Sequence, residues 1–292
     1  MVINFTKYRK TYYAISILLV LASLFSIFYF GLKMGIEFTG GSLLELKFEN
    51  RPSNKDIEEK LADLKLGEIL IQPTAEKGVL LRLKEIDEAT HQEILKKLGD
   101  PEEMSFETIG PLVGDELKKQ TIIAIVLALM AITLYIAFAF RKVSGKVSSF
   151  QYGLASLIAL FHDVLVPIGL FALLGKLYNI EITISFVAAL LTILGFSVHD
   201  TIVVFDRIRE NQLKRSSLTF EEIVNQSLNQ TLGRSLNTVL TVLFTLFALY
   251  LFGGETLKTF ALALIIGITS GAYSSIFIAS PLLVSWQGLK KG

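Results

Sequence analysis

The stretch Gln120–Phe140, QTIIAIVLALMAITLYIAFAF, contains no charged side chain, and it decides the class of fold. As a helix with a rise of 1.5 Å per residue, a run of this length crosses a hydrocarbon core of about 30 Å. The composition agrees, because 52% of the residues are hydrophobic, only 19% are charged, and the mean hydropathy is +0.55. Such a chain is too apolar for an ordinary soluble domain, so we predict a membrane protein.

Five further stretches along the chain are also long enough to span a membrane. Three are uncharged and two contain a single His-Asp dipeptide; they are Thr11–Leu32, Ser235–Gly254 and Thr259–Leu289, and Val147–Gly175 and Ile182–Phe205. We therefore predict an α-helical membrane protein with six transmembrane helices. The first stretch follows a basic start, but no small-residue cleavage pattern comes after it, so we expect a retained helix and not a signal peptide.

Positive charge is divided unevenly between the short loops. Thirteen Lys and Arg residues lie in the N-terminus, in loops 141–146 and 206–234 and at the C-terminal end, whereas the opposite short loops carry two. The positive-inside rule then places both termini in the cytoplasm. The predicted organisation is an N-terminus with the first helix over 1–32, an external domain over 33–119, and helices two to six over 120–292 with cytoplasmic loops 141–149 and 206–234.

The external segment 33–119 alternates between strand and helix patterns. The expected strands are 42–48, 68–72, 79–84 and 102–109, with a turn around Glu76, and the expected helices are 53–64 and 87–98. This βαββαβ order is typical of ferredoxin-like domains. Because that fold hosts many functions, it indicates a binding or docking module and no particular chemistry.

Several classes of function are disfavoured by what the sequence contains. The external segment carries 19 acidic and 13 basic residues, so no basic stripe indicates nucleic-acid binding. Cysteine is absent, and we find no Ser-His-Asp, Cys-His or zinc-spaced cluster and no phosphate-binding glycine loop. We therefore expect neither an enzyme nor a bound cofactor or metal.

One helix, a large external domain and five further helices form the layout of half of a resistance-nodulation-division (RND) transporter. Proteins of that superfamily usually have twelve spans, so a six-span half implies a partner that supplies the other half. Four local runs make the resemblance closer; they are GIEFTGG at 35–41, ALFHDV at 159–164, DTIVVFDRIREN at 200–211 and NQTLGRSLNT at 229–238. Together they resemble the SecF family of the SecDF protein-export complex over essentially the whole chain.

Some positions of these runs are structural motif residues of the family. They are Gly35, Glu37, Phe38, Gly40, Gly41, Asp206 and Arg207. Glu37 stands where the family usually has Asp, and His199 stands where it more often has Asn. The second difference bears on the hydrogen bonding next to Asp200.

The resemblance implies an accessory subunit of the Sec protein translocase, which promotes late steps of polypeptide export across the cytoplasmic membrane. The implied partners are SecD, the SecYEG channel, the translocating polypeptide and membrane lipid. Proton flow is implied as the driving force, with its carboxylate on Asp200, its basic partner on Arg234, and His162, Asp163 and His199 as further candidates. The alternative is a stand-alone half-size RND transporter of lipids or small hydrophobic molecules.

The chemistry of these residues supports an ion path without the family. A carboxylate in a membrane helix costs about 2.5–3.5 kcal/mol on insertion scales. Low dielectric favours the neutral acid and a nearby guanidinium favours the ionised form, so an Asp that gains and loses an Arg neighbour changes its proton affinity. Asp200 lies six residues before Asp206. It is therefore about 9 Å inside the polar edge, within reach of the long Arg234 side chain.

Structural interpretations remain open beside these. Asp200 is alternatively a hydrogen-bond partner that joins two helices, and Arg234 is alternatively an anchor at the membrane surface. The His162–Asp163 pair either relays protons or only holds helices together. A metal site between the two His-Asp pairs is disfavoured because their depths differ. We also expect an amphipathic surface helix over Thr219–Leu232. Small residues that suit a docking face for SecD are Gly267, Ser270, Gly271 and Ser274.

Overall fold

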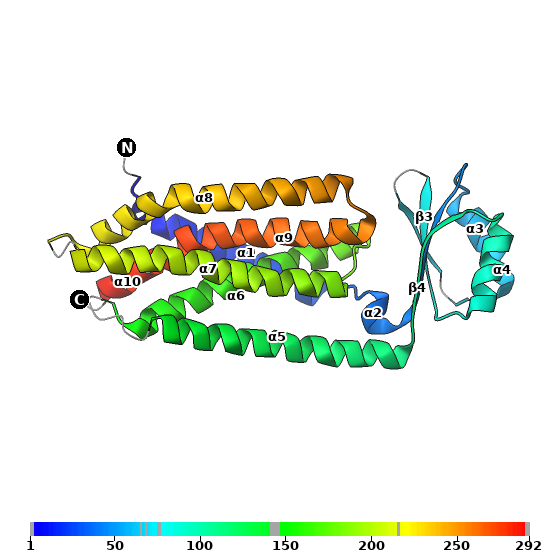
Figure 1. Ribbon diagram of the computed structural model, residues 1–292, viewed down its shortest axis with the longest axis horizontal. Coiled ribbons are helices and arrows are strands. Elements are labelled where there is room, and N and C mark those ends of the chain that lie inside the picture. The colour runs from blue at the N-terminus through cyan, green and yellow to red at the C-terminus, as the bar shows by residue number, and fades with distance from the viewer. Residues whose placement is uncertain are drawn as a thin grey trace. The chain divides into compact units, whose positions relative to one another are not determined.

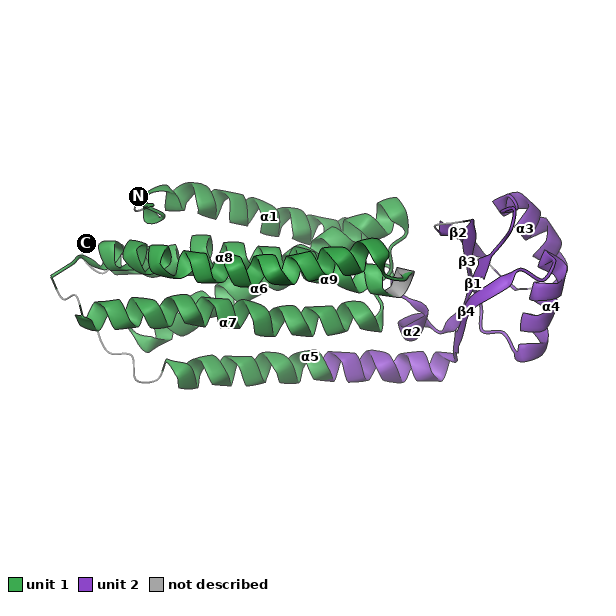
Figure 2. Cartoon of the chain, turned by 45° about the horizontal axis from the view of Figure 1, so that its top comes forward, with its two compact units in different colours: residues 1–33, 124–292 green, residues 34–123 purple. Residues whose placement is uncertain are grey.

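The computed structural model describes residues 3–64, 66–67, 69–74, 77–140, 147–214 and 217–289. The expected loop at 141–146, the lysines at 290–291, the start of the expected strand at Glu68 and the turn at Glu76 lie outside these residues. Two compact units are present (Figure 2): unit 1 comprises Met1–Lys33 and Ala124–Gly292, and unit 2 comprises Met34–Ile123. Each unit has its own hydrophobic core.

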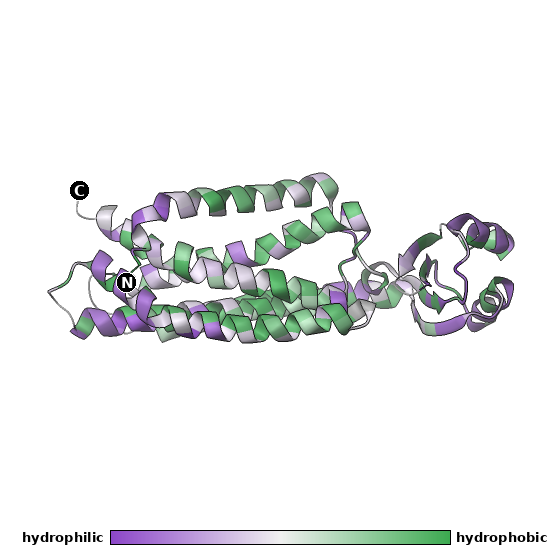
Figure 3. Cartoon of the chain, turned by 90° about the horizontal axis from the view of Figure 1, so that it is seen from above, coloured by the Kyte–Doolittle hydropathy of each residue, from purple (hydrophilic) through white to green (hydrophobic). Residues whose placement is uncertain are grey.

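Unit 1 is a helical bundle, and the described residues include six helices long and apolar enough to cross a membrane (Figure 1). Its elements are η1 (Thr6–Tyr8), α1 (Arg9–Phe30), α5 (Pro111–Ala139, which begins in unit 2), α6 (Ser149–Tyr178), α7 (Ile184–Lys214), α8 (Phe220–Phe252), α9 (Glu255–Ser274), the π-helical segment η3 (Ser275–Ala279) and α10 (Ser280–Leu289). Hydrophobic residues dominate the middle of the bundle, and hydrophilic residues gather at the end where both chain termini lie (Figure 3). The predicted six-span architecture is confirmed.

The start of α8 differs from the expectation. Thr219 and Glu222 form a capping box, in which each side chain accepts a hydrogen bond from the backbone N–H of the other residue. From this cap the helix continues unbroken to Phe252, because the single Gly233 costs only about 1 kcal/mol relative to Ala. The helix expected over 219–232 is present, but it forms the first part of α8 and does not lie on the surface; its apolar residues are buried in the bundle core, and they are Phe220, Ile223, Val224 and Leu228.

Two helix crossings in unit 1 depend on glycine. A Cβ atom on Gly169 of α6 would lie 2.4 Å from the backbone Cα of Ser23 on α1. A Cβ atom on Gly267 of α9 would lie 2.2 Å from the side chain of Ile193 on α7. Membrane helices associate through close packing, and small residues allow their backbones to approach. Gly169 therefore allows the close approach of α1 to α6, and Gly267 allows the close approach of α9 to α7.

Unit 2 is a four-stranded antiparallel sheet with helices packed on one face (Figure 1). Its elements are α2 (Ile36–Thr39), β1 (Gly41–Lys47), α3 (Asn54–Leu61) with η2 (Ala62–Leu64), β2 (Leu70–Thr74), β3 (Gly78–Leu83), α4 (Glu88–Leu98) and β4 (Glu102–Ile109). The strand order is β2-β3-β1-β4, and every neighbouring pair is antiparallel. The predicted ferredoxin-like βαββαβ arrangement is confirmed.

The core of unit 2 follows from the alternation of its strands. Inward-facing residues of β1 and β3 meet the apolar faces of α3 and α4, and the fully buried ones are Leu44, Leu46, Val79, Leu81, Ile57, Leu61 and Ile94. β2 continues through Pro73, whereas the sequence pattern predicts an end at Gln72. Proline is tolerated there because β2 is an edge strand of the sheet.

Two consecutive glycines form the turn that leads into β1. Gly40 has a φ of +71° and Gly41 a φ of +130°, values that side chains of L-residues rarely adopt. A Cβ atom on Gly41 would also lie 2.7 Å from the carbonyl oxygen of Leu83 on β3. Only glycine therefore suits this turn, which accounts for the two consecutive glycines that end the GIEFTGG run.

Asp87 caps α4, and we expect its protonation to loosen the first turn of that helix. Its carboxylate accepts a hydrogen bond from Thr90 N at 2.9 Å, and hydrogen bonds from Thr90 hold the pKa of Asp87 below its usual range. A lowered pKa stabilises the folded state at higher pH, and this contribution is lost as the pH falls through the folded-state value. Hydrogen-exchange protection of α4, corrected for intrinsic rates, should therefore fall below about pH 4.

The matched variants isolate this carboxyl. Asp87→Asn keeps a capping oxygen and should remove most of the pH dependence, whereas Glu93→Gln on the exposed side of α4 should leave it intact. The same loss of protection in Asp87→Asn as in the wild type would assign the effect to another group.

The crossing of α1 and α6 yields a second prediction. Gly169→Ala places a methyl group against the backbone at Ser23, so the two helices must separate. We expect the free energy of unfolding to fall by about 1–3 kcal/mol. Gly195→Ala is the control, because its Cβ meets nothing within 4 Å. The stability of both variants is measured by thermal unfolding in detergent, followed by the fluorescence of the single tryptophan, Trp286. Equal stability in the two variants would contradict the close crossing.

Candidate functional site

Asp200 lies near the middle of α7 with its side chain turned into the bundle. Only 7% of the residue is exposed. Ser235 of α8 donates a hydrogen bond to Oδ1 at 2.8 Å. The other oxygen, Oδ2, is buried and has no hydrogen-bond partner among the described residues. A carboxylate offers about four acceptor positions, so Asp200 is only partly satisfied and can accept a proton or a further donor.

Arg234 of α8 shares a cavity with Asp200. This inner cavity has a volume of about 220 Å³ and is lined by Phe196, His199, Asp200, Val203, Arg234, Ser235 and Thr238. Arg234 is exposed and forms no ion pair or hydrogen bond with any other described residue. His199 is also exposed, on the side of α7 next to Asp200. The structure thus brings Asp200 and Arg234 to one cavity without an ion pair between them.

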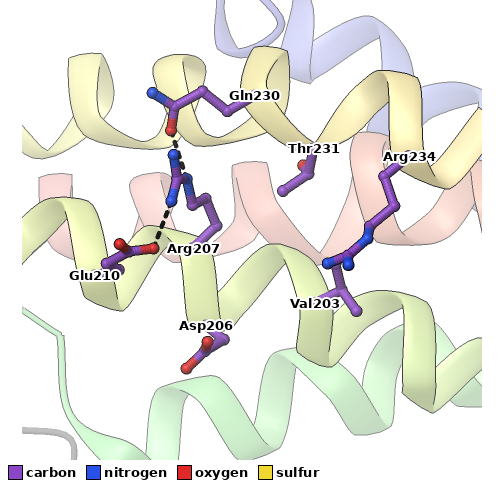
Figure 4. A pocket seen from close by; sticks show the side chains of 7 residues that line it. All are labelled: Val203, Asp206, Arg207, Glu210, Gln230, Thr231 and Arg234. Atoms are coloured by element: carbon purple, nitrogen blue, oxygen red, sulfur yellow. Dashed lines mark hydrogen bonds and ion pairs between the residues drawn. The ribbon is translucent and has the colours of Figure 1, made fainter.

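A second cavity, of about 280 Å³, shares Val203 and Arg234 with the first. Its other lining residues are Asp206, Arg207, Glu210, Gln230 and Thr231. Figure 4 shows the Arg234 side chain extending from α8 toward Val203 on α7. Arg234 therefore adjoins both the inner cavity with Asp200 and this outer cavity, which contains several charged groups.

The His-Asp pair of α6 lies where three helices meet. Asp163 is fully buried. Ser197 of α7 and Ser274 of α9 each donate a hydrogen bond to its Oδ2 at 2.6 Å. Ser270 of α9 donates to Oδ1 at 3.1 Å, and Nδ1 of His162 lies 3.0 Å from the same oxygen. These four partners fill the acceptor positions of the carboxylate, so Asp163 fastens α6 to α7 and α9.

The small residues of α9 lie inside the bundle. Ser270 and Ser274 bond to Asp163, the Cβ position of Gly267 meets α7, and that of Gly271 lies 3.4 Å from Ser197. The expectation that these four residues present a docking face for SecD is wrong. Small residues at this spacing serve close packing between helices, and here the partners are α6 and α7 of the same chain.

The hydroxyl partners of the two carboxylates were missed by sequence reasoning. Ser235 binds Asp200, Ser197 binds Asp163, and Thr201 of α7 lies 2.8 Å from Ser275 of η3. The only available signal was a polar residue within an apolar span. Which carboxylate each hydroxyl serves depends on how the helices pack, and the sequence does not show that.

The remaining motif residues fall into separate places. Gly35 precedes α2 in an extended conformation, Glu37 is half-buried and Phe38 is buried, all within unit 2. In unit 1, Arg207 lines the outer cavity, and Asp206 pairs with Arg209 at 2.8 Å. No group of three His, Asp, Glu or Cys side chains converges as a metal site in the described part of the chain.

Comparison with known proteins agrees with this architecture. The family described as "Protein export membrane protein SecD/SecF, C-terminal" matches residues 90–289, and "SecD/SecF GG Motif" matches residues 25–50. The protein translocase subunit SecF of Thermobaculum terrenum is 50% identical over 301 residues, which cover 98% of this chain and 94% of the relative. The protein translocase subunit SecF of Anaerolinea thermophila is 38% identical, with the same coverage of both chains.

A solved structure matches as well. The crystal structure of SecDF, a translocon-associated membrane protein from Thermus thermophilus, superposes with a TM-score of 0.86 at 34% identity and covers 99% of this chain. This chain spans only 39% of the length of that SecDF chain.

The six spans, the ferredoxin-like domain and the polar groups buried between the helices define a multi-pass membrane protein with the architecture of half an RND transporter. Within that class, the chain belongs to the SecD/SecF family of protein-export membrane proteins.

The network around Asp163 predicts a graded loss of stability. Asp163→Ala leaves three serine hydroxyls without their shared acceptor, and each unsatisfied buried polar group costs about 1–3 kcal/mol. Asp163→Asn keeps one acceptor oxygen and should lose less. Thermal unfolding in detergent should rank wild type above Asp163→Asn and Asp163→Ala last, while the exposed Asp206→Asn stays near wild type. An Asp163→Ala protein as stable as the wild type would contradict the fastening role.

Proposed function

We propose that this protein is an accessory subunit of the Sec protein translocase, which uses the proton motive force to promote late steps of polypeptide export. The observation that carries the proposal is the half-satisfied carboxylate of Asp200, which faces a cavity shared with Arg234 in a member of the SecD/SecF family. Ion-driven membrane proteins place ionisable groups of this kind in their interior, where they face other helices or water-filled cavities.

The coupling follows from the placement of Arg234 and Ser235 on one helix. Asp200 binds a proton when the guanidinium is distant and releases it when the guanidinium approaches. Since Ser235 directly follows Arg234, a movement of α8 changes both the cationic neighbour and the hydrogen bond of Asp200. Each proton that crosses about 100 mV contributes about 2.3 kcal/mol, enough to bias a two-state rearrangement more than tenfold.

SecD is the proposed partner that supplies the other membrane half, because this chain matches only part of a SecDF chain. The SecYEG channel, the translocating polypeptide and membrane lipid are the other proposed partners. We place the protein in the cytoplasmic membrane with both termini in the cytoplasm, following the distribution of Lys and Arg. The domain over residues 33–119 would then lie outside and engage the emerging polypeptide, with no enzymatic step.

The other ionisable residues receive separate roles. We assign Asp163 and His162 to fastening the helices, since all acceptor positions of Asp163 are filled. His199 is exposed beside Asp200 and lines the inner cavity, so we place it at the mouth of the ion path. The alternative of a stand-alone RND transporter is disfavoured, because the similar proteins are named as translocase subunits.

The proposal is tested by export of a model preprotein in cells that carry Asp200→Asn, with and without an imposed proton gradient. We expect the gradient-dependent stimulation to be lost, because the amide cannot take up and release a proton at Asp200. Protein level and SecD association should stay normal. The control is Asp115→Asn, which neutralises an exposed carboxyl of unit 2 and should export normally. Unchanged stimulation in Asp200→Asn would remove Asp200 from the ion path.

A further inference from the structure

Two of the four runs quoted from the sequence meet in the structure at Gln230, in addition to their contact at Asp200 and Ser235. Gln230, in the run at 229–238 on α8, accepts hydrogen bonds from Nε of Arg207 and Nδ2 of Asn211, each at 2.7 Å. Both donors belong to the run at 200–211 on α7. We call Arg207, Asn211 and Gln230 the α7–α8 clamp; Figure 4 shows its Arg207–Gln230 contact.

Further contacts hold the donors of the clamp in place. Asn211 is only 3% exposed and also donates to Oγ of Ser227 on α8 at 2.8 Å. Nη1 of Arg207 pairs with Glu210 at 2.5 Å, and Glu210 pairs with Lys214 at 2.7 Å. Hydrogen bonds with a charged donor are shorter and stronger than neutral ones. The clamp is therefore a fixed link between α7 and α8.

The clamp adjoins the candidate ion site. Gln230 precedes Arg234 by four residues on α8, and Arg207 follows Val203 by four residues on α7. Residues four apart lie on the same face of a helix, so the clamp and the site occupy the facing sides of α7 and α8. Arg207 and Gln230 line the outer cavity, which Arg234 also lines.

We propose that the α7–α8 clamp is a positioning device, which sets the spacing of the two helices so that Arg234 stays beside Asp200 without pairing with it. This proposal rests on the ion coupling proposed at Asp200. When the clamp is opened, α8 moves away from α7, and Arg234 and Ser235 withdraw from the inner cavity together.

The ionisable groups around Asp200 come from three helices. His199 lies on α7 itself, Asp163 and His162 lie on α6, and Arg234 lies on α8. α9 and η3 contribute hydroxyl groups. Of the four ionisable groups, only Arg234 belongs to the helix that the clamp holds against α7. Opening the clamp therefore changes one charge near Asp200 and leaves the other three in place.

The test is the pH profile of gradient-dependent export in cells that produce the full chain with SecD. Gln230→Leu removes the shared acceptor, so the carboxylate loses its cationic neighbour and the midpoint should move to higher pH by about 0.5 unit, a threefold change in proton affinity. Gln230→Glu keeps an acceptor for both donors of the clamp and should retain the wild-type spacing of α7 and α8. Gln226→Leu, one turn earlier on α8, is the control, because its Oε1 has no hydrogen-bond partner among the described residues.

A second measurement reports the spacing of the helices directly. The chain contains no cysteine, so cysteines introduced at Thr192 of α7 and Phe244 of α8 carry unique spin labels on exposed positions. Electron–electron double resonance on the labelled protein should give a longer and broader distance distribution in Gln230→Leu than in Gln226→Leu.

The outcomes separate the two proposals. If Asp200→Asn abolishes gradient-dependent export while Gln230→Leu changes neither the pH profile nor the spin-label distance, the clamp is overturned and ion coupling stands. If Asp200→Asn has no effect on export, the proposed function fails; an unchanged spin-label distance in Gln230→Leu would then overturn the clamp as well. If the pH midpoint and the spin-label distance both change in Gln230→Leu and neither changes in Gln226→Leu, the clamp is supported.

Discussion

The rest of the membrane bundle depends on the burial of Asp163. A carboxylate removed from water must be matched by hydrogen-bond donors, and here the donors come from α7 and α9 as well as from the neighbouring His162. This requirement fixes the rotation of both helices about their axes. Once Ser197 points to Asp163, Asp200 lies three residues further along the same side of α7, where it meets Ser235 of α8. The geometry of the proposed ion site is therefore set by a residue outside it.

The two buried carboxylates show how one chemical group takes two roles. Asp163 has all its acceptor positions occupied, and a change in its protonation would disturb several hydrogen bonds at once. Asp200 has one hydroxyl donor and an oxygen that no other described residue binds. A cation also shares its cavity without pairing with it. The first arrangement favours a permanent link between helices, and the second leaves a buried oxygen free to bind a proton or a further donor.

Most of the fold follows from local properties of the sequence. Apolar length predicts the six spans, and the change from a period of 2 to a period of 3.6 predicts the βαββαβ order. In the structure, Ser53 and Asp87 cap the two helices of that domain. The sequence also predicts that Asp200 and Arg234 lie at similar depth. It does not predict the serines that bind Asp163, the inward position of Gly267 and Gly271, or the burial of the first turns of α8. Each of these depends on which helix faces which, and helical periodicity leaves that choice open.

The unbroken course of α8 has a mechanical consequence. A helix of 33 residues without an interior proline is a stiff rod about 50 Å long, capped at one end by Thr219 and closed at the other by Gly253. A tilt of about 5° around a point near one end moves the other end by about 4 Å. Arg234 lies about 21 Å from the start of this rod, so the same tilt moves it by about 2 Å, and the far end of the helix moves about twice as far. Because a stiff helix transmits such a tilt by itself, the movement of α8 that we propose needs no chain of side-chain rearrangements to reach its other end.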